Sequence, residues 1–418
     1  MSVALTLKAK GLAGIATRAD TIRSRFGVDD EKTRAALDQY LDIVGPAGVQ
    51  PTLPMTAVVL SRHARLAAEY SDRGVEFAVH GLVHSDHAKV GLASQLATIA
   101  EAADRFAAAR VPFSGFRGPY LRESLETQLA LRRLGFMYDS TQAFHFSVLE
   151  ASLQSQDGYR RALDFYRARP ADRYVVRPRL RDGLVDIPVT VPDDEMFVER
   201  LGLGPEEQSA AWRAILRQTH EEEELFTLML HPERIFECGS ALADVLADAR
   251  ALRSVWIARL DEIAAWWRRR SLTRVEVHEV EPGRFRVISL GDPSVTLSLH
   301  RPPHGAERIP AETSVEFLSP VRPVIGVSPM APRGLLDFLR EEGYLVEATR
   351  DPAAYAASIA STDETWSERS VLAAIAAAKW PVARLSRWPL AATSALAISG
   401  DIDSVTLGDF FLRLWETR

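Results

Sequence analysis

The sequence contains almost no cysteine and no long uninterrupted apolar run. Its single cysteine, Cys238, excludes an intrachain disulfide and a cysteine-based zinc site. No run approaches the roughly 18 apolar residues at which a membrane-spanning helix becomes a candidate. The opening stretch, MSVALTLKAKGL, turns basic too early for the apolar core of a signal peptide. We therefore expect a cytoplasmic protein without a membrane span.

The chain also lacks a strong excess of charge of either sign. Its formal net charge is −6 over 418 residues, and the charged residues, 25% of the total, intersperse both signs. This argues against nucleic acid or an anionic membrane as the main partner. With 47% apolar residues the chain has an ordinary globular composition. Its length allows two domains, or one barrel with an appendage.

Strand-like and helix-like segments alternate up to residue 271. We expect strands at residues 3–7, 51–56, 75–79, 112–120, 136–140, 184–189 and 225–230, and helices at 29–44, 57–72, 92–110, 125–134 and 244–270. This alternation predicts a parallel sheet or a (β/α) barrel, in which functional sites lie at the carboxyl ends of strands. Because His80, Arg117, Asp139 and His231 each follow a strand-like run, we expect them to converge on one face.

The pattern changes after residue 271, where apolar residues recur with a period of two. We expect a small antiparallel β unit over residues 272–320. A helix-strand-helix segment with a linker follows at 321–390, and a strand, loop and helix at 391–418. Together with a barrel domain at 1–271, this predicts four parts, the last of which returns to the barrel.

Two histidines four residues apart, His80 and His84, follow the strand-like run at 75–79. Neutral imidazoles at this spacing can share a metal ion when they lie on one helical turn or one tight loop. Surface histidines also occur at this spacing by chance, so the pair alone leaves both interpretations open.

Two further motifs give the histidine pair a context. The sequence Arg117-Gly118-Pro119-Tyr120 follows one strand-like run, and Leu230-His231 ends another. In this order, the three motifs resemble those of the polysaccharide deacetylases, the NodB-homology family also called carbohydrate esterase family 4. The resemblance covers about residues 3–270. It implies a deformed (β/α) barrel and a divalent metal, Zn²⁺, as cofactor.

The first motif of that family, an aspartate pair after its first strand, is missing from the expected place. The strand-like run at 3–7 is followed by Lys8 and Lys10, which cannot bind a metal while charged. Near the other end of the chain, Asp401-Ile402-Asp403 follows an apolar run and resembles the missing motif. We therefore expect a circular permutation, in which the C-terminal strand takes the first-strand role. The alternative is a simple turn in which Asp403 or Ser404 caps the next helix.

The resemblance implies a role for each residue of the site. The metal ligands are Asp403, His80 and His84. The catalytic residues are Asp401 as general base, Arg117 positioning it, the backbone N–H of Tyr120 stabilising the oxyanion, and His231 as general acid. The acyl group contacts Leu230 or Leu228, alongside Tyr120. An acid among Asp186, Asp193, Asp194 and Glu195 orients His231.

These residues predict a metal-dependent hydrolase that removes an acyl group, acetyl, from the nitrogen of an amino sugar or polysaccharide. Two alternatives stay open: a hydrolase of the same fold acting on a non-sugar amide, and an inactive carbohydrate-binding homologue. The lysines near the N-terminus favour the inactive homologue, whereas Asp401 and Asp403 oppose it. The expected partner is a glycan, and the sequence leaves homo-oligomerisation open.

Overall fold

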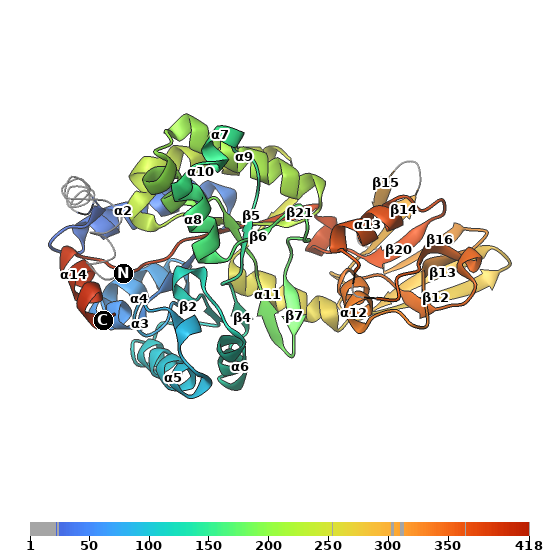
Figure 1. The fold of residues 1–418 in the computed structure, drawn as a ribbon, viewed down its shortest axis with the longest axis horizontal. Coiled ribbons are helices and arrows are strands. Elements are labelled where there is room, and N and C mark those ends of the chain that lie inside the picture. Colours follow the sequence, from blue (N-terminus) through green and yellow to red (C-terminus); the bar gives the residue numbers. More distant parts are fainter. Residues whose placement is uncertain are drawn as a thin grey trace.

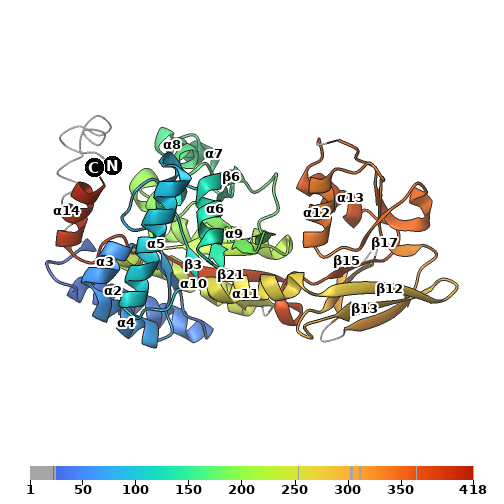
Figure 2. The same cartoon turned by 90° about the horizontal axis from the view of Figure 1, so that it is seen from below.

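The computed structural model describes residue 22 and residues 25–417, except 253, 302–304, 310–312 and 364. The molecule is elongated, with a curled sheet surrounded by helices at one end and a smaller lobe at the other (Figure 1). The same two parts are seen after a quarter turn (Figure 2). The strand expected at residues 3–7, with Lys8 and Lys10 behind it, lies outside the described residues.

The main sheet has nine strands, eight of them in the order β10-β21-β1-β2-β3-β4-β8-β7, with β11 pairing to β21 beside this path. In chain order they are β1 (Thr52–Met55), β2 (Glu76–Val79), β3 (Gly115–Phe116), β4 (Tyr138–Asp139), β7 (Arg179–Arg181), β8 (Leu184–Asp186), β10 (Leu225–Met229), β11 (Val255–Ile257) and β21 (Ser394–Ser399). All pairs are parallel except β7 with β8. The predicted α/β fold with a deformed barrel is confirmed.

Helices cover the outside of this sheet. The main ones are α2 (Glu31–Val44), α3 (Ala57–Arg62), α4 (Ala64–Asp72), α5 (Leu92–Ala108), α6 (Leu125–Arg133), α9 (Pro205–Glu221), α10 (Ile235–Ala251) and α11 (Leu260–Ser271). Strands β1, β2, β10 and β21 are buried at every position, as expected for a parallel sheet with both faces covered. Within the described part of the chain, no helix combines the length and apolar character needed to cross a membrane.

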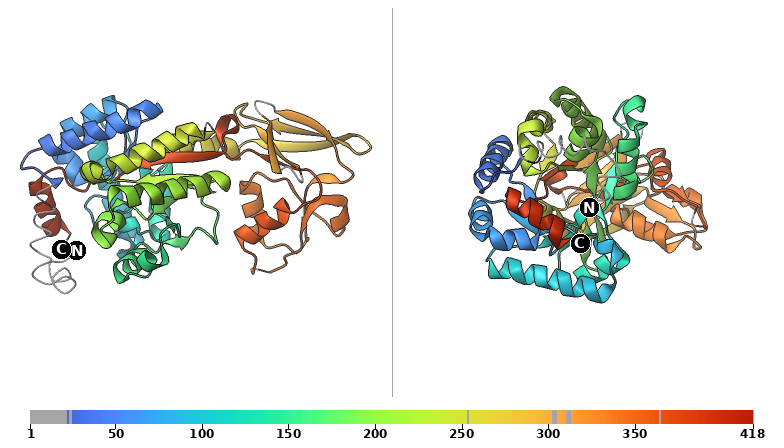
Figure 3. Two further views of the ribbon diagram at one scale, coloured as in Figure 1. Left: turned by 90° about the horizontal axis from the view of Figure 1, so that it is seen from above. Right: turned by 60° about the vertical axis from the view of Figure 1, so that its left-hand side comes forward.

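Strand β21 occupies an interior position, although it lies near the end of the sequence. On one edge it pairs with β10, from Leu225↔Ala395 to Met229↔Ser399. On the other edge it pairs first with β11 and then with β1, at Thr52↔Ser399. The contact with β1 is short, and it resumes only at the isolated bridge Met55↔Ile402. The helix α14 (Leu407–Glu416) then lies across the end of the ring of helices, as the right view of Figure 3 shows.

The lobe consists of three three-stranded sheets, two antiparallel and one parallel. The antiparallel sheets contain β12 (Arg274–Glu281), β13 (Arg284–Leu290) and β16 (Ser314–Leu318), and β14 (Leu297–Arg301), β15 (Gly305–Ile309) and β20 (Val382–Leu385). The parallel sheet contains β17 (Arg322–Val327), β18 (Val346–Ala348) and β19 (Tyr355–Ile359), with α12 (Arg333–Glu341) and α13 (Glu368–Ala376). Strand β20 pairs with β14, so residues 272–320 and 321–390 share one sheet. The division into four parts stays a prediction.

Buried arginines attach the lobe to the barrel. Arg177, before β7, donates to Glu341 at 2.9 Å and also contacts Glu342, which follows α12. Arg270 of α11 donates to the carbonyls of Ser386 and Glu341, at 2.8 and 2.7 Å. Because each buried charge has a partner of opposite charge or a hydrogen-bond acceptor, these contacts fix where the lobe lies.

Two helices expected from the sequence are each interrupted. The segment 244–270 is not one helix: α10 ends at Ala251, β11 pairs with β21, and α11 begins at Leu260. Pairing with a strand far along the chain outweighs local helical periodicity there. The segment 57–72 is broken at His63, whose backbone leaves the helical region at φ −121° and ψ 36°.

Candidate active site

His80 and His84 come together because the chain turns sharply after β2. Gly81 has φ +75°, a left-handed conformation, and a side-chain carbon there would lie 2.5 Å from the ring of His87. Glycine is therefore required for this turn. The two imidazole rings lie with centroids 5.2 Å apart. His80 is fully buried and His84 is 8% exposed.

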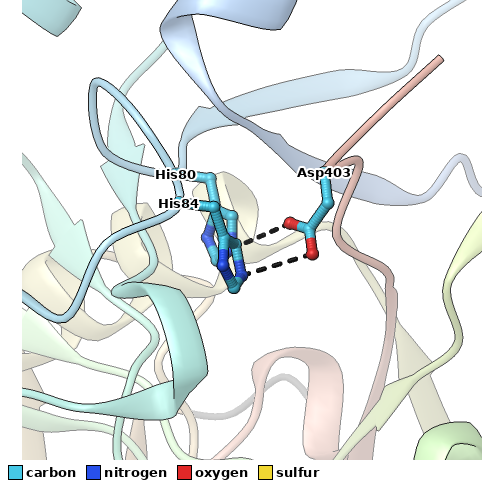
Figure 4. A group of neighbouring side chains, drawn as sticks. All are labelled: His80, His84 and Asp403. Atoms are coloured by element: carbon cyan, nitrogen blue, oxygen red, sulfur yellow. Dashed lines mark ion pairs between the residues drawn. The ribbon is translucent and has the colours of Figure 1, made fainter. Parts of the chain in front are cut away.

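Asp403 reaches these histidines from the other end of the sequence. Its Oδ1 lies 3.4 Å from Nε2 of His80, and its Oδ2 lies 3.2 Å from Nε2 of His84, as Figure 4 shows. One ligand atom from each of the three residues lies within 4.8 Å of the others. Two imidazole nitrogens and one carboxylate oxygen therefore face a common point.

The hydrogen bonding of these groups fits a metal ion. Nδ1 of His80 lies 2.9 Å from the carbonyl oxygen of Arg117, which can only accept, so Nδ1 carries a proton and Nε2 is the nitrogen turned toward Asp403. That Nε2 and Oδ1 of Asp403 are buried without a hydrogen-bond partner. Burial lowers the pKa of His84 well below its ordinary value, which favours the neutral ligand form. Burial alone would raise the pKa of Asp403, but His84, Arg413 and His80 bring it well below its ordinary value.

Asp401 lies beside this cluster and is held by Arg117. Oδ1 of Asp401 accepts from Nη1 of Arg117 at 2.9 Å, and its Oδ2 lies 3.6 Å from Nε2 of His80. The fully buried guanidinium also donates to the carbonyl and hydroxyl of Ser140 and to the hydroxyl of Ser399. Arg117 therefore fixes one oxygen of Asp401 and leaves the other turned toward the metal-binding atoms.

His231 lies just after the end of β10. A side-chain carbon on Gly400 would lie 1.8 Å from the carbonyl oxygen of Leu230, so only glycine lets β21 pass this close to β10. Nδ1 of His231 lies 3.0 Å from both carboxylate oxygens of Asp194, and Arg234 pairs with the same carboxylate at 3.0 Å. Among the four acids considered from the sequence, Asp194 is the partner of His231.

This contact determines the protonation of His231. Burial would lower the pKa of His231, but the Asp194 carboxylate, with Glu233 and Asp401 farther away, raises it well above the ordinary value. Such a pKa favours the protonated imidazole, and the side chain, which is 16% exposed, can reach solvent.

Tyr120 and Leu230 complete the predicted set. Tyr120 has φ 62° and ψ 16°, an uncommon left-handed conformation for a residue with a side chain. Its ring packs edge-on against His84 with centroids 4.2 Å apart. Leu230 and Leu228 are fully buried, and the backbone N–H of Leu230 donates to the carbonyl of Ser399 at 2.8 Å.

The structure thus brings together residues from three distant parts of the sequence. Neither Asp403 nor Ser404 caps α14, whose N-cap is Thr406. Asp139 lies apart from the cluster, buried at the end of β4, where it accepts from Thr141. Sequence reasoning missed Arg413, whose Nη1 donates to Oδ2 of Asp403 at 2.6 Å.

One family model matches part of the chain. Residues 26–138 match the polysaccharide deacetylase family, which confirms the resemblance for the part of the chain that carries both histidines and the Arg117 motif. The match ends before Asp401, so the permuted order stays a prediction. No curated protein matches the chain.

Several solved structures are similar to part of the chain. A putative polysaccharide deacetylase from Mycobacterium smegmatis is 22% identical, with a TM-score of 0.45, over 59% of this chain and 81% of its own. A probable polysaccharide deacetylase from Pseudomonas aeruginosa PAO1 is 18% identical, with a TM-score of 0.44, over 56% and 73%. Puue allantoinase is 17% identical, with a TM-score of 0.43, over 56% and 72%.

Proposed function

We propose that this protein is a metal-dependent N-deacylase that hydrolyses the acetamido group of an amino sugar or polysaccharide to a free amine and acetate. The observation that carries this proposal is the convergence of His80, His84 and Asp403 beside two separate pairs, Asp401 with Arg117 and His231 with Asp194. The two pairs supply a carboxylate that can accept a proton and, separately, an imidazole that can donate one. A protein that only binds carbohydrate needs neither, so the arrangement argues against an inactive homologue.

His80, His84 and Asp403 would hold the metal, for which we propose zinc because two imidazoles and a carboxylate are a common catalytic zinc set. A divalent metal at this point would supply Lewis acidity toward the acyl carbonyl and toward water. Both histidines and Asp403 are buried or nearly so, which keeps them fixed before substrate arrives.

The remaining residues divide the proton transfers between them. The free oxygen of Asp401 would accept a proton from the attacking water, while Arg117 keeps that carboxylate in place. Protonated His231 would donate a proton to the departing amine nitrogen. The backbone N–H of Tyr120 would stabilise the oxyanion, and Leu230 would contact the acyl methyl group.

The proposal is tested with N-acetylated amino-sugar oligomers and metal-analysed protein. Wild type is expected to release acetate, and wild type treated with a chelator is not. The turnover of Asp401→Asn should fall roughly 10²–10⁴-fold, because the amide accepts protons poorly. Asp401→Asn should keep its metal. Full turnover by this variant, or hydrolysis of non-sugar amides only, would contradict the proposal.

Asp194→Asn should change the pH dependence of turnover. The Asp194 charge raises the pKa of His231, so its removal lowers that pKa. His231 must be protonated to act as an acid. As the pH rises, the variant should therefore lose activity at a lower pH than wild type does. The alkaline limb of the kcat/KM profile measures this shift. An unchanged alkaline limb would mean that His231 is not the titrating acid.

A further inference from the structure

Helix α14 is fixed in place beside the site. Thr406 caps its N-terminus and exchanges hydrogen bonds with Asp409. Asp409 is buried and pairs with Arg62 of α3 at 3.2 Å and with His63 at 2.7 Å. Arg413 lies one turn after Asp409, so the anchored helix determines where its guanidinium lies.

The guanidinium of Arg413 is only partly used by the protein. Nη1 donates to Oδ2 of Asp403 at 2.6 Å, and the ring of Phe410 lies 5.4 Å from its central carbon. Among the described residues, Asp403 is its only acidic partner. The side chain is 25% exposed, and the described residues provide no other side-chain acceptor for the guanidinium. Arginine presents several donors in a planar fork, and Asp403 accepts from only one of them.

The balance of charge around the site is positive once a metal is bound. Arg117 pairs with Asp401, and both His231 and Arg234 pair with Asp194. Asp403 alone then faces a divalent cation, and Arg413 adds a further positive charge next to it. Arg413 is therefore both bonded to a metal-binding carboxylate and partly exposed to solvent.

We propose that Arg413 binds a carboxylate of the substrate, so that the enzyme takes acylated amino sugars in acidic glycans, those with a carboxylate on or next to the acylated residue. This inference rests on the proposed function. A carboxylate accepts two parallel N–H donors from arginine, which a neutral sugar hydroxyl cannot do. The hydrogen bond from Arg413 to Asp403 would hold the guanidinium in the orientation needed to bind that carboxylate.

The test compares two N-acetylated oligosaccharides with the same backbone, one carrying uronic acids and the other with those carboxyls reduced to alcohols. Wild type with full metal content should prefer the acidic oligosaccharide by about 10–100-fold in kcat/KM, the range of a charge-assisted hydrogen bond. Arg413→Gln should lose this preference and Arg413→Lys should keep part of it. A loss of metal or of fold would lower both rates together, so the ratio isolates recognition.

Arg122→Gln serves as the matched control, because Arg122 lies just after the Tyr120 motif but pairs with Asp86, at 3.1 Å, and not with Asp403. Its preference should equal that of wild type. Calorimetry with the deacetylated oligosaccharides measures recognition without turnover. Wild type could bind the acidic oligosaccharide through its carboxylate, and lose this binding in Arg413→Gln, while showing no turnover. This result would support the inference and contradict the proposed function. Turnover without a preference, or a preference kept by Arg413→Gln, would overturn the inference alone.

Discussion

Asp403→Asn is expected to bind zinc at least about 100-fold more weakly than wild type, a loss beyond the 10- to 100-fold seen when an outer-shell partner is removed. The substitution replaces the only anionic ligand by a neutral amide. It also removes the negative charge that lies between Arg413 and the metal, so the two positive charges repel each other. His80 and His84 would remain, but neutral imidazoles alone give a weaker site. Competition with a chromogenic chelator measures the affinity.

Asp401→Asn is the matched control for this measurement. The two aspartates are two residues apart, yet Asp401 is bound by Arg117 and Asp403 by the histidine cluster. The Asp401 variant should therefore retain metal while losing turnover. If both variants retain wild-type affinity, or if both lose it equally, the division of roles between base and ligand is wrong.

Removing residues 394–418 is expected to prevent folding. Leu396, Ile398 and Val405 are almost completely buried, and their burial contributes roughly 5–9 kcal/mol at 1.5–3 kcal/mol for each side chain. This is comparable with the whole stability of an ordinary domain, about 5–15 kcal/mol. The deletion also exposes the edges of β1, β10 and β11. Solubility and near-ultraviolet circular dichroism measure the outcome.

A shorter deletion, of residues 406–418, separates the strand from the helix. It keeps β21 and Asp403 and removes only α14, of whose residues Asp409 alone is buried. This protein should remain folded with a modest loss of stability. A folded product from the longer deletion would mean that β21 does not hold the main sheet together and that the permuted arrangement is wrong.

The sequence allowed much of the site to be predicted because its motifs are local. His80 and His84 share one turn, and Arg117 and His231 each directly follow a strand. Asp403 could be proposed because the expected acids were missing elsewhere, and the structure places it 3.2 Å from His84. The catalytic roles of these residues stay predictions.

Features that depend on contacts between distant segments could not be predicted in the same way. Asp194 is one of several neighbouring acids, and only the path of the chain after β9 (Val189–Val191) selects it. Arg413 lies on an amphipathic helix whose direction is set by the anchor at Asp409. Strand β11 has three residues, too few for a clear period, and its partner lies near the end of the sequence.

The interior place of β21 has a consequence for how the protein is made. Strands β1 and β10 are synthesised long before the strand that fills the space between them. Until then, the growing chain carries two unpaired, apolar strand edges, the kind of surface that pairs wrongly with other chains. Closing the sheet joins residues far apart in sequence, which is a slow step. Production of this protein should therefore depend on chaperones or low temperature more than its size alone suggests, and slowing translation upstream of β21 should worsen aggregation.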